Sequence, residues 1–195
     1  MIISILLTIG SYLIGSLSAA IIVCKVMSLP DPRTLGSRNP GATNILRIAG
    51  KKTASLVLLG DMLKGFVPLV LAQALHVEDN VMAAVGLAAF LGHLYPIYFG
   101  FHGGKGVATA LGILLGLAWP LAVAVLATWL FIAKLFHVSS LSAIMAAIMA
   151  PIYTWWLLDS LPKLIMVIII STMLLWRHRA NIQRLFKGAE AKIGQ

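Results

Sequence analysis

The chain has 195 residues, of which 60% are hydrophobic and 11% are charged, and its mean hydropathy is +0.97. An ordinary soluble domain has roughly 25% charged residues, so this composition excludes that class and predicts a single integral membrane domain over residues 1–195. The net charge of +9 does not predict nucleic-acid binding, because cations spread over loops between apolar runs set membrane orientation and meet anionic headgroups.

The metal-binding residue types are few and scattered. The single cysteine, Cys24, excludes an internal disulfide and a cysteine cluster for zinc. The five histidines form no HExxH motif, and the six carboxylates lack the dense spacing that binds magnesium. We therefore expect no metal and no cofactor. We also expect no cleavable signal peptide, because no cation precedes the first apolar run and Lys25 follows it.

Apolar runs of about 20 residues, each able to cross about 30 Å of hydrocarbon, predict an all-α fold. The first run covers residues 2–24. The loop at residues 25–52 then carries six of the fifteen lysines and arginines, so the positive-inside rule makes it cytoplasmic and puts the N-terminus outside. The second span, residues 53–75, leads outward, and residues 81–99 lead back to a second glycine-rich turn.

The apolar run at residues 107–136 is interrupted only at Trp119-Pro120, so it is one long helix or two short ones. Charge decides between the two interpretations. Followed by spans at 141–158 and 161–176, a single crossing would leave the cationic C-terminal tail outside, whereas a hairpin puts the tail inside. We therefore predict about seven transmembrane helices, with the N-terminus outside and the C-terminus cytoplasmic.

The longest polar stretch is LGSRNPGATNILRIAGKK, residues 35–52. Asn39 as an N-cap, Pro40 at the first helical position and Gly50 after the last turn predict a short interfacial helix over residues 40–49.

This helix presents Thr43 and Arg47 on one face, with Asn44 beside them. Backbone N–H groups at a helix N-terminus, a threonine hydroxyl and an arginine together suit a phosphate group. The same residues equally suit a capped interfacial helix whose cations meet lipid headgroups.

The second polar stretch, HGGKGVAT, opens the predicted fourth span. Its glycines let backbone approach a ligand closely, and Lys105 adds a charge beside a helix N-terminus. It is not a Walker A loop, because Gly106 stands where a serine or threonine would hold magnesium. The alternative is a plain glycine turn whose lysine sets topology.

Two charges, Asp61 and Lys64, lie one helical turn apart inside the second span. Charges at such depth are usually paired within the bundle, so we favour a structural role for Asp61 and leave ligand contact open for Lys64. His93 fits a hydrogen bond in the core better than a catalytic role.

The third polar stretch, RHRANIQRLFKGAEAK, puts His178 and Asn181 on one helical face, with Arg177 and Arg184 on the adjoining one. His178 can hydrogen-bond or exchange a proton near neutral pH. The alternative is a stop-transfer cluster, which we prefer for Arg179 and Lys187. Three serines before the sixth span, Ser139, Ser140 and Ser142, either cap its helix or line a pocket.

All three polar stretches face the cytoplasm in this topology and can share one anion pocket. The sequence shows no G-x-S-x-G elbow and no Cys–His pair, so covalent catalysis is not indicated. The spacing alone does not identify the anion.

The motifs GSRNPGATNILR, DMLKG, GHLYPIYFGFHGGKGVAT and RHRANIQRLFKGAEAK, in this order, resemble the bacterial acyl-phosphate-dependent glycerol-3-phosphate acyltransferases. The resemblance extends through nearly the whole chain. It implies an enzyme of the bacterial inner membrane, with its active site on the cytoplasmic side. That enzyme transfers a fatty acyl group from acyl phosphate to the 1-hydroxyl of glycerol 3-phosphate, giving lysophosphatidic acid and phosphate.

The resemblance implies roles for the motif residues, and the charges deep in the second span, Asp61 and Lys64, are added to these. The expected catalytic residues are Ser37, Arg47, Lys105, His178 and Asn181, the expected substrate-binding residues are Thr43, Asn44, Gly103, Gly104 and Gly106, to which we add Ser142, and the expected structural residues are Asp61, Lys64 and Glu190. The expected partners are acyl phosphate, glycerol 3-phosphate and the lipid bilayer, with no nucleic acid; the oligomeric state stays open.

Acyl phosphate is already activated, so positioning and charge neutralisation can suffice for its chemistry. The proton acceptor is His178 or an oxygen of the acyl phosphate, and we favour the second. The rival interpretation is a transporter of a small phosphorylated solute, since glycine-broken helices also bind anions in transporters. A lipid-surface binding module without turnover is a weaker rival.

Overall fold

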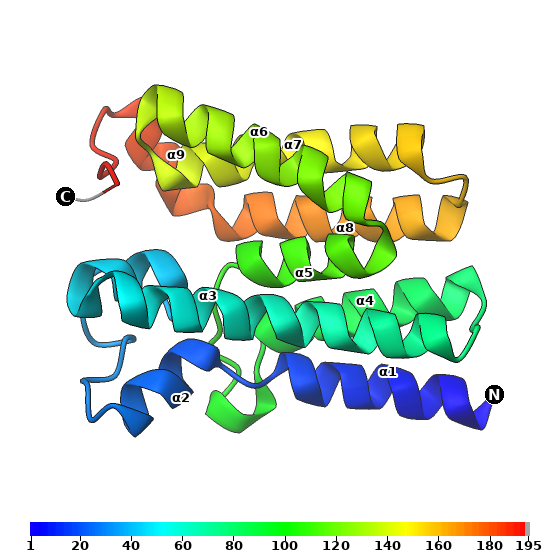
Figure 1. Cartoon of the computed structure of the whole chain (residues 1–195). Helices are drawn as coiled ribbons and strands as arrows, with labels where there is room; N and C mark the ends of the chain where they lie inside the picture. The colour runs from blue at the N-terminus through cyan, green and yellow to red at the C-terminus, as the bar shows by residue number, and fades with distance from the viewer. Residues whose placement is uncertain (194–195) are drawn as a thin grey trace.

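The computed structural model describes residues 1–193, which form nine α-helices and one short 3₁₀ helix and contain no strand. The long helices lie side by side in one bundle (Figure 1). In chain order the elements are α1 (Ile2–Gly15), α2 (Ala19–Val26), α3 (Ala42–Ala74), α4 (Asp79–Leu94), η1 (Ile97–Phe99), α5 (Val107–Leu117), α6 (Trp119–Phe136), α7 (Ser139–Leu157), α8 (Leu161–Arg177) and α9 (Arg179–Phe186).

Helix length and hydropathy fit an integral membrane protein. Four segments are long and apolar enough to cross a bilayer: α3, α4 with η1, α6 and α7. The bent pairs α1–α2 and α8–α9 raise the number to six if each pair is one span, and α5 is a shorter apolar helix. The predicted all-α membrane class is therefore confirmed, while seven spans and their orientation stay predictions.

The first apolar run is not the single helix that we expected over residues 2–24. It is broken between α1 and α2, which meet at a bend of 48°. Two charges of α3 bind the backbone at the break: Lys64 Nζ donates to the Leu17 carbonyl at 2.7 Å, and Asp61 Oδ1 accepts from the Ala19 N–H at 3.4 Å. A helix can break inside a membrane protein when other groups satisfy its backbone in this way.

Helix α3 begins later than predicted, because Gly41 rather than Asn39 is its N-cap and Ala42 is its first residue. The predicted stop at Gly50 is confirmed: its φ of 77° lies in the left-handed region that glycine tolerates. The chain turns there and continues as the long span that ends at Ala74. The first turns of α3 are therefore set at an angle to the span (Figure 1).

The run at residues 107–136 is divided at Ala118, which has an extended backbone, and α5 and α6 run in opposite directions (Figure 1). The interpretation as a hairpin is therefore the one that the structure supports. With 11 residues, α5 is only about 16 Å long. It packs backbone to backbone on α3, because a Cβ atom on Gly112 would lie 1.9 Å from the Met62 carbonyl oxygen.

Two further ends differ from the predicted spans. The third span ends at Leu94, because Pro96 interrupts it before η1. The last span ends at Arg177, and α9 leaves it at a bend of 56° with His178 between the two helices. His178 and Asn181 therefore lie at a helix junction rather than along one continuous helix.

Candidate active site

The second and third polar stretches meet in space. The ammonium of Lys105, in the loop before α5, donates a hydrogen bond to the side-chain oxygen of Asn181 in α9. These residues are 76 positions apart. The second and third polar stretches therefore meet at this pair of side chains, and their forming one substrate site stays a prediction.

The carboxylate of Glu190 fixes Asn181 from the other side. Its Oε1 accepts from Asn181 Nδ2 at 2.6 Å and from the Ser140 hydroxyl at 2.8 Å, while Oε2 accepts from Arg184 Nε at 2.7 Å. Burial alone would raise the pKa of Glu190, but these hydrogen bonds hold it below its ordinary value. Because Glu190 takes the amide N–H of Asn181, the amide oxygen is turned toward Lys105. This geometry matches the structural role expected for Glu190.

Lys105 lies in a cationic environment. The pKa of Lys105 is lowered to about 8, mainly by burial; the charges of Arg184, Arg177 and Arg47 add to this lowering, and Glu190 opposes it. These charges come from α9, the end of α8 and the start of α3. One anion placed beside Lys105 would therefore lie in the field of residues from all three polar stretches.

The glycine loop in front of Lys105 is tightly enclosed. A Cβ atom on Gly103 would lie 2.0 Å from the His93 carbonyl oxygen, and one on Gly104 would lie 2.3 Å from His93 Nε2. Gly106 has a φ of +90°, a conformation that favours glycine. Arg177 donates to the Gly103 carbonyl at 2.8 Å through Nη2 and to the Gly104 carbonyl at 3.2 Å through Nε. The sequence pattern does not predict which carbonyls Arg177 contacts.

His178 is buried at the junction of α8 and α9, and its Nδ1 lies 2.8 Å from the Leu174 carbonyl oxygen. A carbonyl only accepts, so Nδ1 donates, and in the neutral ring Nε2 then carries the lone pair. Lys105 and Glu190 both lie close enough for their charges to act on this ring. His178 thus belongs to the same charged cluster.

The first polar stretch presents exposed residues, of which Arg47 lies close enough for its charge to act on Lys105. Ser37 and Arg47 are exposed, and the Thr43 hydroxyl lies 3.2 Å from that of Ser139 at the start of α7. Asn44 differs from them, because it is only 1% exposed and its side chain is fully engaged with the loop before it. It accepts from the Ser37 N–H and donates to two loop carbonyls. A substrate contact by Asn44 stays a prediction, and the structure gives it a bracing role.

The serines at the start of α7 do not cap that helix, whose N-cap is Val138. Ser142 is fully buried and donates to the Val138 carbonyl of its own chain segment at 2.9 Å. The structure therefore does not bring Ser142 to the cluster around Lys105, and its predicted role in substrate binding stays a prediction.

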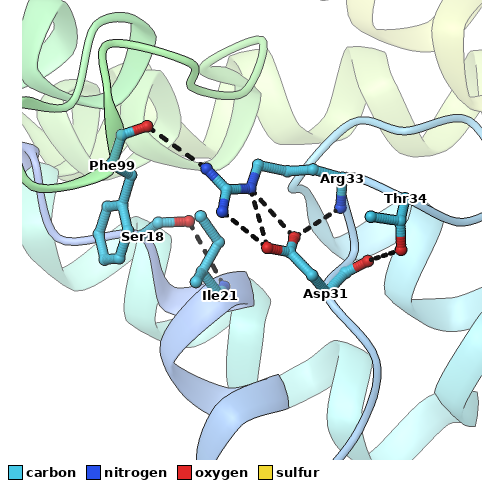
Figure 2. Close-up of polar contacts among 6 residues, drawn as sticks. All are labelled: Ser18, Ile21, Asp31, Arg33, Thr34 and Phe99. Atoms are coloured by element: carbon cyan, nitrogen blue, oxygen red, sulfur yellow. Dashed lines mark hydrogen bonds and ion pairs between the residues drawn. The ribbon is translucent and has the colours of Figure 1, made fainter.

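The side chain of Arg33 links Asp31 in the first loop to the Phe99 carbonyl in η1, and we call this set of contacts the Arg33 clasp. The sequence did not reveal it. Figure 2 shows the Arg33 guanidinium bound to the Asp31 carboxylate, with Nη2 to Oδ2 at 2.7 Å, and also to the Phe99 carbonyl at 3.4 Å. The hydrogen bond from Arg33 holds the pKa of Asp31 below its ordinary value. The Arg33 clasp joins the segment that carries Ser37 to the turn that precedes the glycine loop.

Beneath the glycine loop lies a buried charge cluster. Lys64 Nζ is 2.9 Å from Asp61 Oδ1, and His93 Nδ1 is 3.7 Å from the same oxygen. Asp61 and Lys64 are 3% and 6% exposed. Since their contacts are with each other and with the break between α1 and α2, the geometry matches the structural role expected for both. Within residues 1–193, no group of three or more His, Cys, Asp or Glu side chains could hold a metal ion.

Residues 5–188 match the protein family described as glycerol-3-phosphate acyltransferase. The glycerol-3-phosphate acyltransferase of Methylococcus capsulatus is 53% identical over 184 residues, covering 94% of this chain and 93% of the relative. That of Hydrogenovibrio crunogenus is 54% identical over 182 residues, covering 93% and 87%. The resemblance carried by the four motifs is therefore confirmed over nearly the whole chain.

Two solved structures share the fold. Both are crystal structures of PlsY, described as an integral membrane glycerol 3-phosphate acyltransferase. The glycerol 3-phosphate form has a TM-score of 0.94 at 39% identity, covering 98% of this chain and 96% of that one. The lysophosphatidic acid form has a TM-score of 0.92 at 38% identity, covering 98% and 95%.

Proposed function

The chain belongs to the glycerol-3-phosphate acyltransferase family, and we propose that it transfers a fatty acyl group from acyl phosphate to the 1-hydroxyl of glycerol 3-phosphate. The products are lysophosphatidic acid and inorganic phosphate, so the reaction is an early step of phospholipid synthesis. The observation that carries this proposal is the contact of Lys105 with Asn181, within range of the charges of Arg47, Arg177 and Arg184. Such a cluster neutralises phosphate-bearing anions.

Because acyl phosphate is already activated, the main task of the protein is to position its two substrates. The hydroxyl oxygen attacks the acyl carbonyl carbon, the bond from that carbon to the phosphate oxygen breaks, and phosphate leaves. Holding two anionic substrates together and aligned makes this step effectively intramolecular. We assign phosphate neutralisation to Arg47 and Lys105, with Ser37 and Thr43 as hydrogen-bonding neighbours from the first polar stretch.

The hydroxyl proton needs an acceptor. We propose a phosphate oxygen of the acyl phosphate, which leaves with the proton as inorganic phosphate. His178 would orient the attacking hydroxyl, because its Nδ1 is held by the Leu174 carbonyl and its Nε2 can accept a hydrogen bond. Asn181 would hold Lys105 in place through the amide that Glu190 fixes.

The first expected result concerns turnover. Purified protein incubated with palmitoyl phosphate and glycerol 3-phosphate should release inorganic phosphate and lysophosphatidic acid in equal amounts, and neither product should form when glycerol 3-phosphate is omitted. The measurement is phosphate release together with mass spectrometry of the lipid. Uptake of glycerol 3-phosphate into proteoliposomes without either product would instead support a transporter and contradict the proposal.

The protein's place in the cell follows from the same reasoning. We propose that it lies in the bacterial inner membrane with seven spans, the N-terminus outside and the site facing the cytoplasm. Three observations support this orientation: the cations of the first loop, the exposed cations of α9, and the short α5, which makes a hairpin with α6.

A labelling experiment tests the orientation. With Cys24 replaced by alanine, Glu78→Cys should react with a membrane-impermeant maleimide in spheroplasts, because we place it outside. Lys187→Cys should react only after the membrane is permeabilised. Both positions are exposed, so burial will not confuse the comparison. Labelling of Lys187→Cys in intact spheroplasts would contradict the proposed orientation.

A further inference from the structure

Arg177 is the last residue of α8 and binds the glycine loop through two successive carbonyls, those of Gly103 and Gly104. A guanidinium presents its donors in a rigid planar fork, so the two bonds set the orientation of both peptide units together. The next residue along the chain is His178. Arg177 therefore fixes the glycine loop relative to the helix junction that carries His178 and Asn181.

The two bonds also determine where the loop's donors point. In a trans peptide the carbonyl and the following N–H point in opposite directions, and the described chain has no cis peptide bond. Turning the carbonyls of Gly103 and Gly104 toward Arg177 therefore turns the N–H groups of Gly104 and Lys105 away from it. Among residues 1–193 these two N–H groups have no hydrogen-bond acceptor. Successive free N–H groups beside a lysine form a concave site for an anion.

His93 closes a different side of the same loop. Its carbonyl oxygen and its Nε2 occupy the space that Cβ atoms on Gly103 and Gly104 would need. The ring is buried, and its other nitrogen faces Asp61, which is itself paired with Lys64. The loop is thus packed against His93 and hydrogen-bonded to Arg177 through its carbonyls.

We propose that Arg177 is a positioning residue for glycerol 3-phosphate: against the support of His93, it aims the N–H groups of Gly104 and Lys105 at the substrate's phosphate. The proposal rests on the proposed function. In this arrangement Arg177 touches the loop rather than the substrate. Its loss should therefore weaken binding of glycerol 3-phosphate and leave the chemistry of the bound complex largely intact.

The experiment compares Arg177→Ala with Arg179→Ala. Arg179 is exposed, lies two residues further along the chain, and stacks over Trp176. Arg179→Ala therefore removes the same charge without removing a contact to the glycine loop. We expect Arg177→Ala to raise the KM for glycerol 3-phosphate at least about tenfold, with little change in kcat, because the loop loses two hydrogen bonds to a charged group and losing one corresponds to about tenfold. Arg179→Ala should have the KM of the wild type. Equal KM values for the two variants would overturn the proposal.

Arg177→Lys is a control for a folding defect in Arg177→Ala. A lysine keeps the charge but lacks the fork, so it should restore part of the affinity. Misfolding would lower the active fraction, and hence the apparent kcat, without raising KM. Calorimetric binding of glycerol 3-phosphate, with no acyl donor present, separates this inference from the proposed function. Weaker binding by Arg177→Ala alone supports the inference even if the wild type shows no turnover, and equal binding by both alanine variants refutes it.

Discussion

Lys105→Ala is expected to raise the KM for glycerol 3-phosphate by one to two orders of magnitude, because a hydrogen bond to a charged group contributes about 1.5–3 kcal/mol. The variant removes the ammonium that lies among the arginine charges and frees the Asn181 amide. Steady-state kinetics with varied glycerol 3-phosphate measure the effect. Lys134→Ala, at an exposed position of α6, is the matched control and should behave as the wild type. Unchanged kinetics for Lys105→Ala would remove this residue from the site.

The KM for glycerol 3-phosphate is expected to depend on pH through the same lysine. Burial lowers its pKa to about 8, so the ammonium is charged below that pH and loses its proton as the pH rises through it. A phosphate monoester has a second pKa of about 6 and is a dianion throughout the range from pH 7 to 9.5. The KM for glycerol 3-phosphate should therefore rise above pH 8 because the enzyme, not the substrate, changes its charge.

Lys105→Arg provides the comparison, since a guanidinium stays charged across this range. Whatever its KM at pH 7, that value should change less between pH 7 and 9.5 than the wild-type value does. If the two proteins show parallel profiles, the titrating group is not Lys105.

Features that depend on local residue type could be predicted from the sequence. The helix boundary at Gly50 follows from a backbone preference that glycine carries with it, whereas Pro120 left one helix or two open until the charge of the tail favoured a hairpin. The positive-inside rule predicted only that the Lys105 and Asn181 stretches lie on the same side of the membrane, and their contact comes from the fold. Both kinds of inference need only residue type and order.

What escaped prediction depends on distances between segments. The pattern placed Arg177 on a helical face beside that of His178 and Asn181, and only the fold shows that it binds the glycine loop. Arg33 was likewise one cation among six in the first loop, yet it joins that loop to the Phe99 carbonyl. Asn44 belongs to the same motif as Thr43, but its side chain is buried and is hydrogen-bonded to the first loop. The break between α1 and α2 needs partners from α3, which periodicity cannot supply.

That break leads to the largest expected effect on stability. Asp61→Asn leaves the Lys64 ammonium buried without its counter-charge, and breaking a buried pair in this way costs about 3–5 kcal/mol. For a chain of this size the midpoint of thermal unfolding in detergent should fall by about 10 °C. Asp79→Asn is the control, because it removes the same charge from the more exposed Asp79–Lys163 pair. Exposed pairs contribute about 1 kcal/mol or less, so that midpoint should barely move.

The double variant Asp61→Asn with Lys64→Met separates pairing from simple loss of side chains. Since it leaves no uncompensated charge, it should be more stable than Asp61→Asn alone. It should still unfold below the wild type, because the Leu17 carbonyl loses the donor that satisfies it at the break in the first span. If the double variant were less stable than Asp61→Asn, each side chain would act on its own. The two charges would then hold the break between α1 and α2 independently rather than as a pair.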